Sequence, residues 1–139
     1  MLLRFFPIPA AIAWAAACLW LGAVPCAAQT PDGKKDYDQY CAVCHGPRGD
    51  GKGVASYTLS GTNPSDLTQL SRRNGGKFPF DEVYAIVDGR KEFPSHERLN
   101  MPFFGTNLEM EEGQSREAKA RVDARITAIV RYVESLQKK

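Results

Sequence analysis

The stretch Cys41-Ala42-Val43-Cys44-His45 decides how this sequence is interpreted. On a helical turn, two thiols three positions apart lie on the same side of the backbone, and here a histidine follows directly. With this spacing, two cysteines can add to the two vinyl groups of one porphyrin while the neighbouring imidazole ligates the iron. The motif therefore predicts covalent attachment of one haem c through Cys41 and Cys44, with His45 as an axial ligand.

Three other kinds of site compete with this interpretation. A redox-active disulfide needs only the two cysteines and usually follows a strand in a βαβ unit, a pattern that this sequence lacks. A zinc site needs a second pair of ligands, and after residue 28 the sequence offers only His96 in addition to the motif. A structural disulfide explains neither the spacing of the cysteines nor His45.

A second axial ligand is predicted at Met101, which is followed by Pro102. A thioether is a soft ligand for haem iron, and its pairing with histidine raises the reduction potential. The surrounding segment, residues 93–105, is rich in proline and aromatic side chains and is interpreted as non-helical. The alternatives are His96 as the sixth ligand, an open sixth position, or Met101 as an ordinary core residue. Met110 stands among acidic residues and is expected in a solvated segment that leads into the last helix.

Residues 1–28 differ in composition from the rest of the chain. Arg4 is their only charged residue, and a long apolar run follows it and ends in small residues. This pattern predicts a secretory signal peptide that is cleaved after Ala28, so that residues 29–139 form the mature domain in the periplasm. The alternatives are a retained membrane anchor, because the apolar run approaches the length that spans a bilayer, and a lipid-modified Cys26.

Length and charge exclude other classes of protein. The chain has 139 residues, with 18 Lys and Arg against 16 Asp and Glu, for a net charge of +2. This length allows one domain beside the signal peptide. The nearly balanced charge argues against a nucleic-acid-binding protein, which needs a clear basic excess. No residue stands out as a general acid, a general base or a nucleophile.

The hydrophobic pattern predicts helices and no strands. Helices are expected at residues 32–44, 79–88 and 115–136, and residues 46–76 are expected to be mostly loop because they are rich in Gly, Ser, Thr, Asn and Pro. So long a loop is unusual in a small domain, unless it covers a flat apolar cofactor. The predicted core faces of the second and third helices are Phe80, Val83, Tyr84 and Val87, and Ala118, Val122, Ile126, Ile129, Val133 and Leu136.

Taken together, these features resemble a class I c-type cytochrome, of the kind found as mono-haem proteins in the bacterial periplasm. Gly33 and Tyr37 stand eight and four positions before the first cysteine, where this family packs a small residue and an aromatic against its last helix. The last helix here offers Ile129 and Tyr132 for that contact. The glycine-rich stretch 46–53 is also similar to a loop of bacterial members. The resemblance implies an all-α cytochrome c fold, with three to five helices wrapped around one covalently attached haem.

The resemblance also implies contacts to the haem. In this family a proline carbonyl accepts a hydrogen bond from the ligating histidine, and Pro47 and Pro64 are the candidates here. The mature domain lacks the tryptophan that some members use to bind a haem propionate. Arg72, Arg73, Arg90 or a tyrosine are the candidates for that role.

A haem iron with two protein ligands has no position for a substrate, which favours an electron carrier over an enzyme. We therefore expect a monomeric, periplasmic single-electron carrier whose axial ligands are His45 and Met101. Its expected partners are redox proteins, namely a dehydrogenase, a terminal oxidase or both, and it meets a membrane only if residues 1–28 are retained. The alternative is a peroxidase-like haem enzyme or a gas-binding protein with an open or displaceable sixth position. A dedicated electron-accepting subunit of a dehydrogenase or oxidase would differ from a free carrier in its partner and not in its chemistry.

Overall fold

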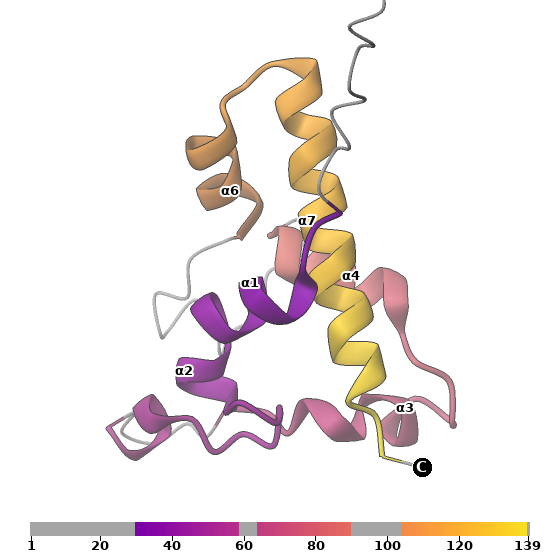
Figure 1. The fold of residues 1–139 in the computed structure, drawn as a ribbon. Coiled ribbons are helices and arrows are strands. Elements are labelled where there is room, and N and C mark those ends of the chain that lie inside the picture. The colour runs from indigo at the N-terminus through magenta and orange to yellow at the C-terminus, as the bar shows by residue number, and fades with distance from the viewer. Residues whose placement is uncertain (1–29, 59–63, 90–103, 139) are drawn as a thin grey trace, which may run out of the picture.

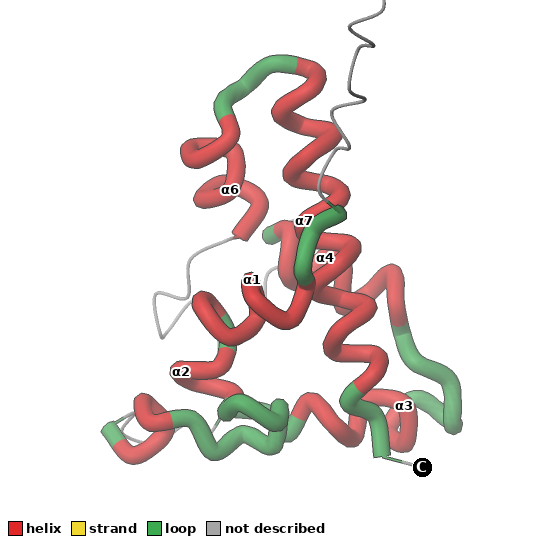
Figure 2. The backbone as a smooth tube through the Cα atoms, viewed as in Figure 1, coloured by secondary structure: helices red, strands yellow, loops and turns green. Residues whose placement is uncertain are grey.

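A computed structural model of the chain describes residues 30–58, 64–89 and 104–138. Over these residues the regular structure is helical, and no strand is present among them (Figure 2). Four of the helices have eight residues or more: α1 (Gly33–Tyr40), α4 (Phe80–Asp88), α6 (Phe104–Glu112) and α7 (Arg116–Ser135). The predicted all-α architecture is confirmed.

The twenty-residue helix α7 is the central helix of the domain (Figure 1). It begins where predicted, because the Ser115 side chain caps it by accepting a hydrogen bond from the Ala118 amide. Helices α1, α4 and α6 all pack against it. Its buried residues are Ala118, Val122, Ile126, Ile129, Val130 and Val133. All but Val130 were predicted, and the sixth predicted position, Leu136, is partly buried against the same core.

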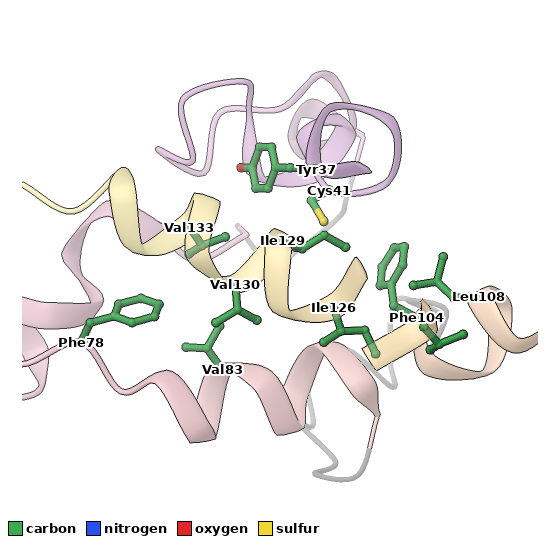
Figure 3. Packing of buried hydrophobic residues seen from close by; sticks show 11 residues of the cluster. Tyr37, Cys41, Phe78, Val83, Phe104, Leu108, Ile126, Ile129, Val130 and Val133 are labelled. Carbon is green, nitrogen blue, oxygen red and sulfur yellow. The ribbon is translucent and has the colours of Figure 1, made fainter. Parts of the chain in front are cut away.

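Helix α1 crosses α7 at close range. A Cβ atom at Gly33 would lie 1.9 Å from the carbonyl oxygen of Ala128, so only glycine allows the two backbones this near. One turn later, the rings of Tyr37 and Tyr132 pack with their centroids 5.1 Å apart. Figure 3 shows Tyr37 and Cys41 pointing toward α7 from this crossing. The contact predicted from Gly33, Tyr37, Ile129 and Tyr132 is confirmed.

Helix α4 covers another side of α7. It follows Pro79 and ends at Gly89, whose φ of 90° is the left-handed conformation that glycine adopts at low cost. Val83 is buried, and Phe80, Tyr84 and Val87 pack against the same core. The predicted helix and its predicted apolar face are both confirmed.

Three local predictions need correction. The helix expected over residues 32–44 is interrupted at Cys41 and continues as the short helix α2 (Ala42–His45). The expected loop at residues 46–76 contains three short helical turns: η1 (Val54–Tyr57), η2 (Leu67–Gln69) and α3 (Leu70–Arg73). The segment from Phe104 onward forms α6, although its aromatic start and acidic end suggested a non-helical, solvated stretch.

Candidate functional site

The predicted haem-binding motif forms one tight turn between α1 and α2. The Cys41 amide still donates to the carbonyl of Tyr37, at 2.8 Å, so the turn continues directly from α1. The amides of Cys44 and His45 both donate to the carbonyl of Cys41, at 3.2 and 2.9 Å. These bonds hold both thiols and the imidazole on a single helical turn. Cys41 and His45 are 7% and 6% exposed, whereas Cys44 is only partly buried.

Both thiols of the motif are free. Cys41 belongs to the hydrophobic core, and its burial raises the pKa of its thiol to about 12. A redox-active disulfide needs the opposite, because a lowered pKa and an exposed thiolate give such cysteines their reactivity. A thioether carries no charge and is apolar, so an apolar pocket of this kind suits a cysteine that is bonded to a vinyl carbon.

His45 is oriented by a backbone carbonyl. Its Nδ1 lies 3.1 Å from the carbonyl oxygen of Ser65. When Nδ1 carries the proton and donates it to this oxygen, the lone pair of the ring is on Nε2, the nitrogen through which such a histidine ligates a metal. Neither proline that the family resemblance suggested is the acceptor. The carbonyl of Pro64 instead faces Gly51: a Cβ atom on residue 51 would lie 2.5 Å from the Pro64 carbonyl oxygen.

The glycine-rich stretch after His45 folds back onto the motif. The amide of Gly51 donates to the carbonyl of His45 at 2.8 Å, and the amide of Gly53 donates to the carbonyl of Cys44 at 3.1 Å. Gly46 has a φ of 79° and Gly51 a φ of 76°, conformations that side chains strongly disfavour. Gly53 is needed for space, because a Cβ atom there would lie 2.3 Å from the carbonyl oxygen of Val43. This loop therefore holds the motif turn in place through the backbone carbonyls of Cys44 and His45.

The segment that carries Ser65 is held from both sides. The amide of Leu67 donates to the carbonyl of Gly49 at 2.7 Å. From the other end of the chain, the Gln137 amide side chain donates to the carbonyl of Leu67 at 2.7 Å and accepts from the Ser71 amide at 2.8 Å. The acceptor of His45 is thus tied to the glycine loop and to the end of α7. The sequence did not identify Ser65 or Gln137, because backbone acceptors and single glutamines carry no motif.

The donor set fits a haem c better than a bare metal ion. Two free thiols and an oriented imidazole share one turn, as the motif requires. No group of three or more His, Cys, Asp or Glu side chains that could hold a metal ion occurs in residues 30–58, 64–89 and 104–138. A zinc site built on Cys41 and Cys44 therefore finds no further ligands in this part of the chain.

Several predicted residues lie outside the described part of the chain: Met101, His96, Arg90 and residues 1–28. Met110 is described; it lies on α6 and is 74% exposed, as its acidic neighbours suggested. Of the candidates for a propionate contact, Arg72 and Arg73 lie on α3, where Arg73 donates to the backbone carbonyl of Asp66. Among the described helices, none is long and apolar enough to cross a membrane.

One comparison with known proteins also supports a haem-binding domain. A family model described as "Cytochrome C oxidase, cbb3-type, subunit III" matches residues 28–115, which include the motif turn, the glycine loop and α4. No curated protein and no solved structure matches the chain. The match covers more than half of the sequence and begins beside the predicted cleavage site. The chain therefore belongs to the family of cytochrome C oxidase, cbb3-type, subunit III, and its domain is a class I c-type cytochrome that serves haem-based electron transfer.

Proposed function

We propose that this protein is a periplasmic single-electron carrier, with one haem c bound covalently through Cys41 and Cys44 and with His45 and Met101 as axial ligands. The observation that carries the proposal is the motif turn, in which two free thiols and an oriented imidazole lie together. Each thiol adds across one vinyl group, with sulfur bonded to one carbon and the proton on the other. The addition consumes no oxidant.

A bound haem supplies the exchange of one electron between ferric and ferrous iron. The chain supplies the environment in which this exchange occurs. His45 is held by the Ser65 carbonyl, and such a hydrogen bond makes the imidazole a stronger donor to the metal. The core around Cys41 excludes water from this side of the site. A rigid, dry site of this kind suits an electron carrier.

Met101 is proposed as the sixth ligand on the chemistry of its side chain and on its sequence context. The other methionine after residue 28, Met110, is a poor candidate because it is 74% exposed on α6. An iron with both axial positions filled binds no substrate, so a methionine ligand agrees with the role of an electron carrier.

The partner and the location follow from the family and from the first 28 residues. The family description names a subunit of an oxidase, so we propose that this domain passes electrons to an oxidase complex. Residues 1–28 have the composition of a secretory signal, which supports cleavage after Ala28 and a periplasmic domain of residues 29–139. The intact mass of the protein from a periplasmic extract tests this: a chain that begins at Met1 would contradict the cleavage.

The axial ligands are tested by the sulfur-to-iron charge-transfer band of the ferric holoprotein. We expect the wild type to have this band, Met101→Ala to lose it and to bind cyanide or carbon monoxide, and Met110→Ala to keep it. His96→Ala is expected to keep it as well. Absence of the band from the wild type would favour the alternative, a peroxidase-like or gas-binding haem protein with an open sixth position.

A further inference from the structure

A partly buried arginine joins three helices beside the motif. Arg125 of α7 has a side chain that is only 17% exposed. Its Nε and one Nη donate to the two carboxylate oxygens of Asp36 on α1, at 3.0 and 2.9 Å. Asp36 itself is 7% exposed. This two-pronged geometry is the strongest form of a pairing between arginine and a carboxylate.

The remaining Nη of Arg125 reaches the end of α6. It lies 3.0 Å from a carboxylate oxygen of Glu111 and 3.3 Å from one of Glu112. Arg121, one turn earlier on α7, donates to the other oxygen of Glu112 at 2.7 Å. We call Arg121, Arg125, Asp36, Glu111 and Glu112 the Arg125 cluster. Its three carboxylates and two guanidinium groups give it one net negative charge.

The balance of charge in this cluster depends on Arg125. The carboxylates beside it, Asp36 first, raise the pKa of its guanidinium well above the ordinary value, so it stays charged. Without Arg125, the buried carboxylate of Asp36 would have no described cation beside it. A buried charge that has lost its counter-charge keeps its full field, because little water remains to screen it.

The cluster lies next to the first attachment cysteine. Asp36 lies on α1, and Cys41 is the residue that caps the end of that helix. Tyr40, the residue immediately before Cys41, donates its hydroxyl to Glu111 at 2.7 Å. The charge of Asp36 acts on Cys41, since it helps burial to raise the pKa of that thiol. The charge of Asp36 therefore acts at the sulfur atom that would carry the haem.

We propose that Arg125 sets the reduction potential of the haem by balancing the carboxylates that lie beside Cys41. Ferric iron carries one more positive charge than ferrous iron, so negative charge nearby stabilises the ferric state and positive charge the ferrous state. Arg125 is paired with Asp36 on α1 and acts through the electrostatic field at the attachment turn. The inference rests on the proposed attachment of the haem at Cys41 and Cys44.

The test is a redox titration of the holoprotein at neutral pH and low salt. Arg125→Gln removes a positive charge, so we expect the ratio of ferrous to ferric protein at a fixed ambient potential to fall by about threefold. Glu111→Gln removes a negative charge, and the same ratio is expected to rise. Arg125→Lys keeps the charge and is expected to stay near the wild type.

The two glutamine variants separate charge from structure. Both weaken the contact between Arg125 and Glu111, and the glutamine at position 111 can still accept from Tyr40. A loosened structure would shift both potentials in the same direction, whereas the lost charges shift them in opposite directions. Arg131 and Glu134 are the matched controls, because they form an exposed pair on the same helix α7. Arg131→Gln and Glu134→Gln are expected to leave the potential unchanged.

The proposal is overturned if the two potentials move in the same direction or if neither moves relative to these controls. Should Arg125→Gln fail to fold, Glu111→Gln and Arg125→Lys still test the proposal. An unchanged reduction potential in Glu111→Gln overturns it, and Arg125→Lys is the control that keeps the positive charge. Failure of the proposed function gives a different result, since a wild-type protein without covalent haem on a denaturing gel would refute the attachment itself.

Discussion

Gly33 of α1 lies directly against the backbone of Ala128 in α7, where a Cβ atom on residue 33 would come within 1.9 Å of the Ala128 carbonyl oxygen. The contact joins the first and the last helix of the described chain. It also sets the position of the motif turn, because α1 ends at Tyr40 and Cys41 follows at once.

Substitution of Gly33 is therefore expected to destabilise the domain. Gly33→Val should lower the free energy of unfolding by at least about 1–3 kcal/mol, because the two helices have to move apart. Ala124→Val places the same side chain at an exposed position of α7 and should cost much less. Urea unfolding of both variants measures the difference; equal midpoints would contradict the close crossing.

Tyr37 is expected to make the folded state sensitive to alkali. Its hydroxyl is buried and donates to the Gly46 carbonyl at 2.8 Å, and burial raises its pKa above the ordinary value. Below a pH of about 10 the phenol is neutral in both the folded and the unfolded chain, so its contribution is complete. Above that pH the unfolded chain loses this proton first, and the free energy of unfolding falls as the pH rises.

Urea midpoints between about pH 8 and pH 11 test this. Tyr37→Phe should be less stable than the wild type at pH 8, by about 1–3 kcal/mol, because the Gly46 carbonyl loses its buried partner. Its stability should then fall less steeply with pH. Tyr57→Phe is the control, since Tyr57 is 85% exposed. A Tyr37→Phe curve parallel to that of the wild type would show that another group titrates.

Gly53→Ala is expected to damage the motif turn without straining its own backbone. Gly53 has a φ of −72°, which any residue adopts, but an added methyl group would lie 2.3 Å from the Val43 carbonyl oxygen. The turn between Cys41 and His45 would have to open. We expect less holoprotein per unit of expressed chain, measured by haem stain on a denaturing gel. Lys52→Ala, at the exposed neighbouring position, should give wild-type yields.

Gln137 is expected to stabilise the His45 side of the domain from the far end of the chain. Its side chain bonds to the backbones of Leu67 and Ser71, close to the carbonyl that orients His45. Gln137→Ala leaves these partly buried groups without their partner and should cost about 1–3 kcal/mol. Ser135→Ala removes an exposed hydroxyl that bonds only within α7, and it should cost clearly less. Hydrogen exchange at the amides of Leu67 and Ser71 should accelerate in the first variant alone.

The helices that the sequence predicted well are those whose ends carry local signals. Ser115 caps α7, and Pro79 and Gly89 bound α4, so the boundaries depend on residues close to them in the chain. Helix α6 has such a signal at its C-terminal end, where Gly113 has a φ of 94° and donates to the Glu109 carbonyl at 2.9 Å, but its interior gives no clear pattern. Its buried residues, Phe104, Gly105 and Leu108, give little helical periodicity, and it is held by neighbours instead: Gly105 against the Asp88 backbone and Phe104 against the Tyr40 ring.

The candidate site also has a part that depends on neighbouring residues in the sequence and a part that depends on distant ones. The motif turn could be predicted because its chemistry lies within five consecutive residues. The partner of His45 could not, because Ser65 acts through its backbone and lies twenty residues away. Arg125 is one of several basic residues on α7, yet its side chain is only 17% exposed and is paired with Asp36, eighty-nine residues earlier in the sequence. No pattern within α7 distinguishes it from the exposed arginines beside it.

The burial of Cys41 bears on the order of events when this protein matures. In the finished fold the thiol is 7% exposed and shares the core with Ile126 and Ile129 of α7 (Figure 3). Helix α7 follows the motif in the chain and is synthesised after it. Under the proposed attachment at Cys41, the thiol is accessible to haem before α7 packs against it and is covered afterwards. The proposed attachment of haem therefore has to precede the packing of α7, because the folded chain buries the thiol that would react.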